Sequence, residues 1–158
     1  MSANRFKPHV FILPEDDANR QIANGFVVSF DIKQIQILPV AGGWRNVCNI
    51  FLSDHVSQME RFNLRRMILL IDFDGEISRY DYVKGLIPQG LEDRVFVLGA
   101  RNDPESLRRS GLGTFETIGS RIADDCINGT QTIWTDSLLL HNEREIERLR
   151  SVICPMLT

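Results

Sequence analysis

Residues 67–75, MILLIDFDG, contain the pattern that decides the fold of this chain. Five apolar residues follow one another and Gly75 closes the segment, which is typical of a strand buried on both faces of a parallel sheet. Asp72 and Asp74 come where this strand ends. Ligands of open α/β sheets bind beyond the carboxyl ends of the strands, and residues i and i+2 of an extended segment point the same way. We therefore expect the two carboxylates to face one ligand.

Two aspartates at this spacing predict a site for a hard divalent cation. Two like charges about 4 Å apart repel by about 1 kcal/mol even in water, and by more in a cleft. Mg²⁺ removes that repulsion and prefers carboxylate oxygens as ligands. The alternative is that Asp72, Asp74 and Gly75 are only turn residues at the end of the strand. The pair alone does not decide between the two.

The composition is that of an ordinary globular protein. The chain has 158 residues, of which 43% are hydrophobic and 25% charged, so disordered and fibrous classes are excluded. The net charge is −3 and no polybasic run is present, so nucleic acid would have to bind through a local patch or a metal. No signal pattern or membrane-spanning apolar run is found. We expect one α/β domain, residues 1–158, in the cytoplasm and without a membrane.

The cysteine pattern indicates a reducing compartment. Cys48, Cys126 and Cys154 are scattered along the chain without a Cys-x-x-Cys pair. An odd and sparse count is typical of cytoplasmic proteins. We therefore expect neither a structural zinc site nor a disulfide framework.

Strand and helix patterns alternate along the rest of the chain. Apolar runs predict further strands at residues 9–13, 35–40, 95–99 and 133–134. Amphipathic patterns predict helices at residues 18–26 (with Gly25 as its stop), 44–61 and 142–152, and helices beginning near residues 104 and 114. Such alternation implies a three-layer, Rossmann-like α/β fold, with a mainly parallel sheet of about 4–5 strands and helices on both faces. The strand at residues 35–40 alternates in polarity and is expected nearer the edge of the sheet.

Two other strand ends carry features that belong with the aspartate pair. The first strand is followed by Glu15 and Asp16, and the strand at residues 35–40 by Gly42 and Gly43. Asp is a common N-cap and acids favour the first helical turn, so Asp16 has a structural explanation, whereas Glu15 lies at the strand tip itself. Right-handed crossovers place the strand ends on one edge, which brings Glu15 toward the pair. The glycines indicate a tight turn or a close approach to a ligand.

Together these motifs resemble the TOPRIM domain of topoisomerases, primases, OLD-family nucleases and small RNA-maturation nucleases. The resemblance is carried by residues 11–15 (FILPE), 39–43 (PVAGG) and 69–74 (LLIDFD) and covers residues 8–100, with residues 104–158 as a helical extension. In that family the Asp-x-Asp pair binds Mg²⁺ for phosphoryl transfer at a nucleic-acid backbone. The resemblance implies that Asp72, Asp74 and Glu15 bind Mg²⁺ or Mn²⁺, that Glu15 is the catalytic acid or base, and that nucleic acid is the partner.

Additional candidates for this site are Asp16, Gly42, Gly43, Glu105 and Glu116. Some relatives add a glutamate after the fourth strand, and both Glu105 and Glu116 lie in that region. Glu105 also fits the first turn of a helix, with no function needed. The family's glutamate is usually followed by glycine, whereas Asp16 follows here. Without a catalytic tyrosine domain, zinc ribbon or ATPase module, the resemblance implies a nuclease or a nuclease subunit.

Two alternatives remain open. Residues 71–75 (IDFDG) also look like the first motif of haloacid-dehalogenase-type phosphatases, with Asp72 as nucleophile and Asp74 as general acid, although Glu76 replaces the usual Thr or Val. That function leaves Glu15 remote and needs a lysine near Asp72, for which Lys84 is the close candidate. The other alternative is a non-catalytic interaction module, with a protein partner or as a homo-oligomer, whose acids are caps and turns.

Overall fold

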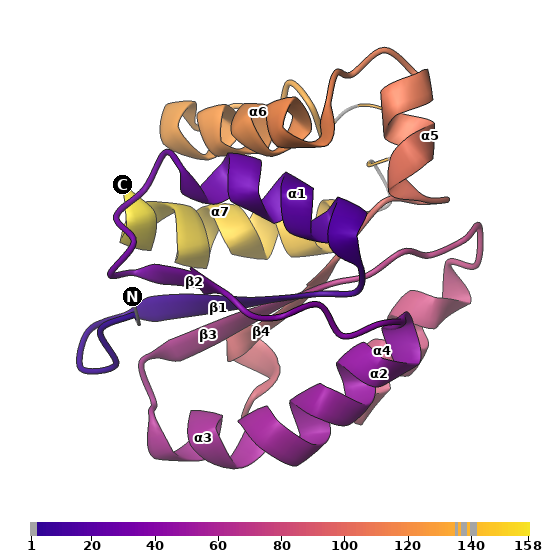
Figure 1. Cartoon of the computed structure of the whole chain (residues 1–158). Helices are drawn as coiled ribbons and strands as arrows, with labels where there is room; N and C mark the ends of the chain where they lie inside the picture. Colours follow the sequence, from indigo (N-terminus) through magenta and orange to yellow (C-terminus); the bar gives the residue numbers. More distant parts are fainter. Residues whose placement is uncertain (1–2, 135, 137–138, 140–141) are drawn as a thin grey trace.

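The computed structural model describes residues 3–134, 136, 139 and 142–158 (Figure 1). Its centre is a four-stranded, all-parallel sheet in the order β2-β1-β3-β4. The strands are β1 (His9–Pro14), β2 (Ile35–Ile37), β3 (Arg65–Leu70) and β4 (Val95–Leu98). β3 pairs with both β1 and β4, so the apolar run that predicted a buried strand is an interior strand. β2 lies at the edge, as its alternation predicted.

Helices cover both faces of the sheet, so the fold has three layers (Figure 1). On one face lie α1 (Asp17–Val27), α5 (Pro104–Arg109), α6 (Phe115–Asn128) and α7 (Glu143–Leu157). On the other lie α2 (Trp44–Ile50), α3 (Val56–Arg61) and α4 (Ser78–Leu86). A π-helical segment (Phe51–His55) joins α2 to α3, and a 3-10 turn (Glu92–Arg94) precedes β4. The predicted three-layer α/β class is confirmed.

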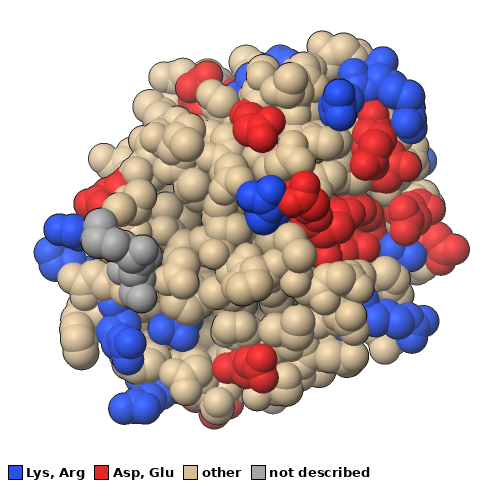
Figure 2. Space-filling model, in the orientation of Figure 1, with Lys and Arg blue, Asp and Glu red and all other residues tan. Residues whose placement is uncertain are grey.

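Charge is distributed unevenly along the strand direction. Acidic side chains follow β1, β3 and β4, and they gather on the right of Figure 2, where the strands end. Basic residues precede or begin the strands, among them Arg5, Lys7, Lys33, Arg65 and Arg94. The carboxyl edge of the sheet is therefore the acidic end of the molecule.

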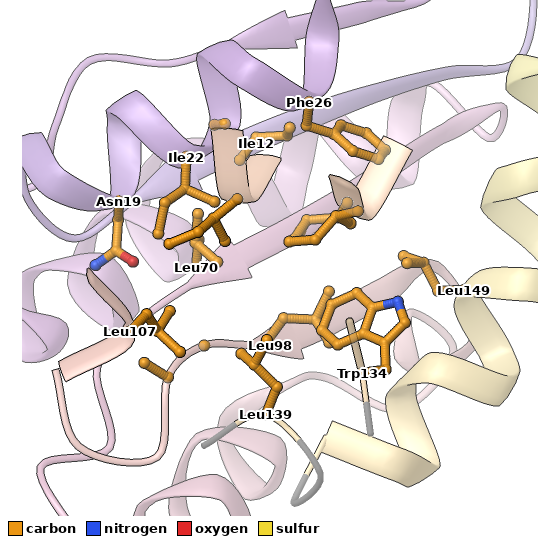
Figure 3. Close-up of a pocket in the computed structure, with 16 residues that line it drawn as sticks. Ile12, Asn19, Ile22, Phe26, Leu70, Leu98, Leu107, Trp134, Leu139 and Leu149 are labelled. Atoms are coloured by element: carbon orange, nitrogen blue, oxygen red, sulfur yellow. The ribbon is translucent and has the colours of Figure 1, made fainter. Parts of the chain in front are cut away.

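Alternate strand residues build two cores. Val10, Ile12, Ile68 and Phe96 pack with α1, α6 and α7, whereas Leu13, Met67, Leu69 and Val97 pack with α2, α3 and α4. Because both faces are covered, the strands have no polar side, which explains their continuous apolar runs. The first core retains a cavity of about 60 Å³ (Figure 3). Among its described lining residues only Asn19 is polar, and Asn19 lies toward the carboxyl edge.

Two glycines let α1 and α6 approach closely. A Cβ atom on Gly25 would overlap the carbonyl oxygen of Glu116, and one on Gly119 would overlap the carbonyl oxygen of Ile22. The prediction that Gly25 ends the first helix is wrong, because α1 continues to Val27. Helix packing, which a local pattern does not report, is what places a glycine there.

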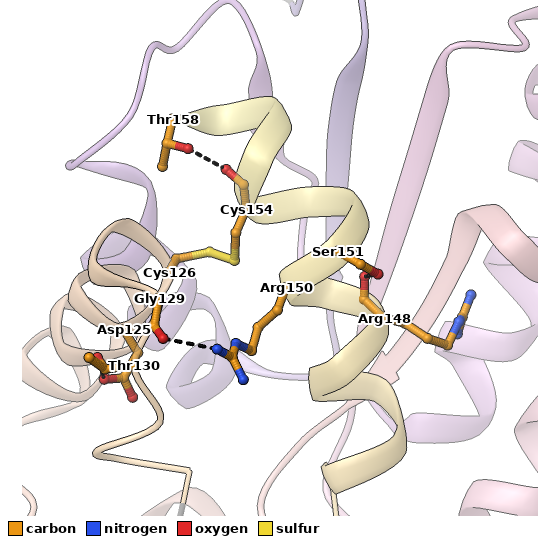
Figure 4. Close-up of a disulfide and its surroundings, with 9 residues drawn as sticks. All are labelled: Asp125, Cys126, Gly129, Thr130, Arg148, Arg150, Ser151, Cys154 and Thr158. Atoms are coloured by element: carbon orange, nitrogen blue, oxygen red, sulfur yellow. Dashed lines mark hydrogen bonds between the residues drawn. A yellow bond between two sulfur atoms is a disulfide. The ribbon is translucent and has the colours of Figure 1, made fainter.

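The C-terminal part of the chain departs from three predictions. Cys126 of α6 and Cys154 of α7 form a disulfide (Figure 4), so the expectation of no disulfide is wrong. Residues 133–134 are not a strand. They lie in a turn in which the carboxylate of Asp125 accepts hydrogen bonds from the amides of Thr132 and Ile133 at 3.0 and 2.9 Å. The terminal helix continues beyond residue 152 to Leu157.

Glu145 in α7 and Asn142, which precedes α7, form hydrogen bonds with the backbone along the outer edge of β4. Glu145 accepts a hydrogen bond from the amide of Val97 at 2.8 Å. Asn142 accepts from the amide of Gly99 at 3.2 Å and donates to its carbonyl oxygen at 3.0 Å. Glu145 also accepts from Tyr80, Lys84 and Arg148, and so is fully paired although it is 1% exposed. Within the described part of the chain, no helix has the length and apolar character to cross a bilayer.

Candidate functional site

The chain reverses its progress across the sheet between β1 and β3. After β1 it forms β2 on one side, and it then returns to form β3 on the other side of β1. In α/β proteins the crevice at the carboxyl ends of strands at such a reversal is where ligands bind. Glu15 follows β1 directly and Asp72 comes two residues after β3, so both lie at this position.

Glu15 is hydrogen-bonded to the Asp-x-Asp segment. Its Oε2 accepts from the backbone amide of Asp72 at 2.6 Å, across 57 residues of sequence. Glu15 is 9% exposed, and burial is the main cause that raises the pKa of its carboxyl group. The amide of Asp72 opposes this shift, while the neighbouring charges of Asp16 and Asp74 add to it. The acid that the sequence placed at a strand tip thus contacts the segment it was expected to approach.

An asparagine connects Asp16 to Asp72. Asp16 caps α1 by accepting from the amide of Asn19 at 2.9 Å, and it also accepts from the Asn19 side chain at 3.1 Å. The same side-chain nitrogen donates to Oδ1 of Asp72 at 3.0 Å. Asn19 is 1% exposed, and sequence reasoning missed it. Its signal was a polar residue on the apolar stripe that Ile22 and Phe26 continue.

Asp72 is the most perturbed carboxylate of the site. Burial raises its pKa to about 8, with the charges of Glu15 and Asp16 adding to the effect and the hydrogen bond from Asn19 opposing it. Three carboxylates thus share a crevice with few donors. Either a proton or a cation relieves such crowding.

Asp74 differs from Asp72 in exposure and in backbone conformation. Its φ is +48°, in the left-handed region that Asp tolerates better than most residues, and its side chain is 57% exposed. Arg79 donates to the Asp74 carboxylate at 3.1 Å and to the backbone carbonyl oxygen of Asp72 at 2.6 Å. The expectation that both aspartates point the same way assumed extended backbone, but β3 ends at Leu70. Arg79 nevertheless keeps the two residues in one cluster.

The additional candidates lie in three different places. Gly42 and Gly43 have positive φ angles, and their amides donate to the carbonyl oxygen of Glu15 at 2.8 and 3.2 Å, so they form the turn that sequence indicated. Asp16 is in the cluster as an N-cap. Glu105 and Glu116 are exposed residues of α5 and α6, and within the described residues neither is hydrogen-bonded to the cluster.

Glu15, Asp16, Asp72 and Asp74 are called the acidic cluster below. Carboxylate oxygens are the donors that Mg²⁺ and Mn²⁺ prefer, so the chemistry of the cluster fits a hard cation. As the side chains stand, no three or more His, Cys, Asp or Glu residues in the described ranges are grouped to hold a metal ion. Glu15, Asp72 and Asp74 are each engaged by a protein donor. An ion would have to replace some of these bonds.

Lys84 is not part of this cluster. Its ammonium group pairs with Glu145 of α7 at 3.2 Å. A comparison of the chain with known protein families, with curated proteins and with solved structures found no match in any of the three. The acidic cluster and its position in the sheet are therefore the basis for a functional proposal.

Proposed function

We propose that the chain binds Mg²⁺ or Mn²⁺ at the acidic cluster and carries out phosphodiester chemistry on nucleic acid, as a TOPRIM-like nuclease or nuclease subunit. The observation that supports this most is the hydrogen bond between Glu15 and Asp72 at the reversal point of a parallel sheet. Buried carboxylates that lie close together, with fewer basic side chains beside them, repel one another, and a divalent ion removes that repulsion.

Each residue of the cluster has a distinct task in this proposal. Asp72 and Asp74 hold the ion, with Glu15 as a further ligand or as the group that takes and returns a proton. When bound, such an ion supplies polarisation of a phosphoryl oxygen and a water of lowered pKa. Asn19 fixes the orientation of the Asp72 carboxylate, and Arg79 fixes that of Asp74. Burial raises the pKa of Glu15, which brings it closer to the range of a general acid or base.

Calorimetric titration with Mg²⁺ and Mn²⁺ tests the metal site. We expect wild type to bind and Asp72→Asn to lose binding. Asp17→Asn is the matched control, since Asp17 is the adjacent acid in sequence but is 65% exposed and paired with Arg20. Wild type that binds no metal at millimolar concentration, or an Asp72→Asn variant that binds equally well, would refute the metal site.

Metal-dependent cleavage of labelled oligonucleotides tests the chemistry. Asp72→Asn and Glu15→Gln should each lose cleavage while keeping the circular dichroism of wild type. Cleavage that persists in Asp72→Asn would exclude the proposed centre.

A non-catalytic interaction module, with a protein partner or as a homo-oligomer, is the second candidate. It is favoured by the fact that Asp16 is an N-cap and that Asp74 is paired with Arg79 within the fold. Wild type without metal binding and without cleavage would make it the leading function. A phosphatase is favoured less, because the lysine it needs near Asp72 pairs with Glu145 instead.

A further inference from the structure

Trp44 lies beside the acidic cluster, among two arginines and a tyrosine. The guanidinium carbons of Arg79 and Arg45 lie 4.5 and 5.0 Å from the centre of the Trp44 ring system. The Tyr82 ring meets it edge to face, with ring centres 5.6 Å apart. We call these four residues the aromatic platform.

The platform is joined to the acidic cluster on two sides. Arg79 stacks on Trp44 and also donates to Asp72 and Asp74. Trp44 begins α2 immediately after Gly43, whose amide is hydrogen-bonded to the carbonyl oxygen of Glu15. A molecule that contacted Trp44 would therefore have its neighbouring group at the cluster.

The platform presents aromatic and apolar surface to solvent. Trp44 is partly exposed and Tyr82 is 54% exposed, whereas the other tryptophan, Trp134, is 6% exposed in the core. Val40 and Ile77, which lie in the loops that lead to α2 and α4, are 43% and 42% exposed. Exposed apolar surface that adjoins a polar centre commonly marks a binding site.

The two arginines of the platform differ in their freedom. Arg79 is held by Asp72 and Asp74 and its side chain is 12% exposed. Arg45 is exposed and has no acidic partner within ion-pair distance in the described part of the chain. Arg45 can leave the Trp44 ring and turn to an anion, while Arg79 remains in place.

We propose that the aromatic platform binds an unpaired base of single-stranded nucleic acid. The base stacks on Trp44 in place of the Arg45 guanidinium group, Arg45 contacts the backbone phosphate, and the adjoining phosphodiester lies at the acidic cluster. Aromatic rings with nearby arginine are the general means of holding single strands, whereas the bases of a duplex are stacked on one another and unavailable. This inference rests on the proposed function, because it names the substrate class of that same site.

Tryptophan fluorescence tests the platform. The chain has two tryptophans, so Trp134→Phe leaves Trp44 as the only reporter. In an Asp72→Asn background, which is designed not to cleave, we expect a single-stranded oligonucleotide to quench Trp44 and to bind about tenfold or more tightly than the duplex of the same sequence. Equal or tighter binding of the duplex would overturn the proposal.

Variants separate stacking from general surface effects. We expect Trp44→Ala to weaken single-strand binding about tenfold by fluorescence anisotropy and Trp44→Phe to retain most of it. Arg45→Glu, which changes an exposed residue that contacts the Trp44 ring, should weaken binding and reduce its salt dependence. Phe6→Ala, at an 82% exposed position before β1, should change nothing. Unchanged affinity in both Trp44→Ala and Arg45→Glu would exclude the platform.

The two proposals fail in different ways. Strand binding that depends on Trp44, without any metal-dependent cleavage, would support the platform and refute the nuclease. Metal-dependent cleavage that is unchanged in Trp44→Ala and equal on single strands and duplex would support the nuclease and refute the platform. Absence of binding to any oligonucleotide would overturn the platform, and would direct attention to a protein partner for the exposed aromatic surface.

Discussion

At the scale of single residues, Asp72 combines deep burial with two acidic neighbours. It is 6% exposed and its pKa is raised to about 8 by burial and by Glu15 and Asp16. Its pKa in the unfolded chain is near 3.8. Between these two values the folded protein binds more protons than the unfolded chain, so this group makes stability fall as pH rises. A buried carboxylate that costs stability in this way is expected to serve binding rather than stability.

Asp72→Asn should therefore stabilise the metal-free protein at pH 8. The amide retains an oxygen for the hydrogen bond from Asn19 and removes the buried charge, so we expect a gain of about 2 kcal/mol in the free energy of unfolding. The gain should be small near pH 4, where wild-type Asp72 is protonated in the folded state. Urea denaturation with a chelator at both pH values measures this. If the variant is no more stable than wild type at pH 8, the buried Asp72 carboxylate does not destabilise the fold.

Asn19→Ala tests the residue that joins Asp16 to Asp72. It leaves both carboxylates without a shared donor and enlarges an apolar cavity, and we expect a loss of about 2 kcal/mol. Asn24→Ala, at a partly buried position later in α1, is the control and should cost about 0.5 kcal/mol or less. Thermal unfolding of both variants gives the comparison, and equal losses would speak against a special role for Asn19.

At the scale of elements, α7 acts as a cover for the edge of the sheet. The amide of an edge strand usually needs a hydrogen-bond acceptor from water, another strand or a side chain. For the amide of Val97, the acceptor is the side chain of Glu145. Burial and the hydrogen bond to Glu145 raise the pKa of Tyr80. The disulfide then attaches the C-terminal half of α7 to α6 (Figure 4).

Glu145→Ala should destabilise the fold severely. It leaves the Val97 amide, Lys84 and Arg148 without their buried acceptor, and removal of one side of a buried ion pair costs about 3–5 kcal/mol. Glu145→Gln keeps an acceptor for the amide and should lose clearly less. Urea unfolding curves measure the loss in the free energy of unfolding for both variants. A surface ion pair contributes up to about 1 kcal/mol, so a loss below about 1 kcal/mol for Glu145→Ala would refute this account.

Loss of the disulfide should also lower stability. The Cys126–Cys154 bond closes a segment with a sequence separation of 28, and loop-closure entropy gives about 3.6 kcal/mol for such a length. Cys154→Ser is the test and Cys48→Ser, which removes the free buried thiol, is the control. Alkylation followed by mass spectrometry reports whether the bond forms. Three modified cysteines in the unreduced, unfolded protein would show that it does not.

The helices and strands that the sequence predicted well are those determined by residues close to one another in the chain. The run at residues 67–71 predicts β3 because both faces of an interior parallel strand are apolar. Asp103 and Thr114 predict helix starts because each accepts a hydrogen bond from an amide three residues later. Side-chain contacts that the strand order does not imply were missed, unlike the approach of Glu15 to Asp72, which the strand order does imply. Glu145 meets Val97 across 48 residues and Asn19 meets Asp72 across 53, and no local pattern encodes such contacts.

At the scale of the whole molecule, the described helices within residues 104–158 are not an appendage of the sheet. The core on the α1 side joins Val10 and Ile68 of the strands to Ile146, Leu149 and Ile153 of α7. That part of the chain also supplies the edge cover of β4. The helical extension expected from the resemblance thus joins α1 in one of the two layers that bury the sheet.

Unfolding should therefore be a single cooperative transition. In Trp44→Phe the remaining Trp134 reports on the core that α7 shares with the strands, while far-ultraviolet circular dichroism reports on all helices. Because one sheet carries both cores, we expect the two signals to change at the same urea concentration. Separate midpoints would mean that the C-terminal helices unfold on their own.

The bond between Glu15 and Asp72 has a consequence for how the protein matures. The two residues come from the first and third strands, so the cluster does not exist until β3 has docked beside β1. The proposed cation would recognise only the folded chain, so it would raise the melting temperature as its concentration rises above its dissociation constant. A third strand that paired out of register would leave Glu15 and Asp72 apart, and the proposed site would then lack its ligands.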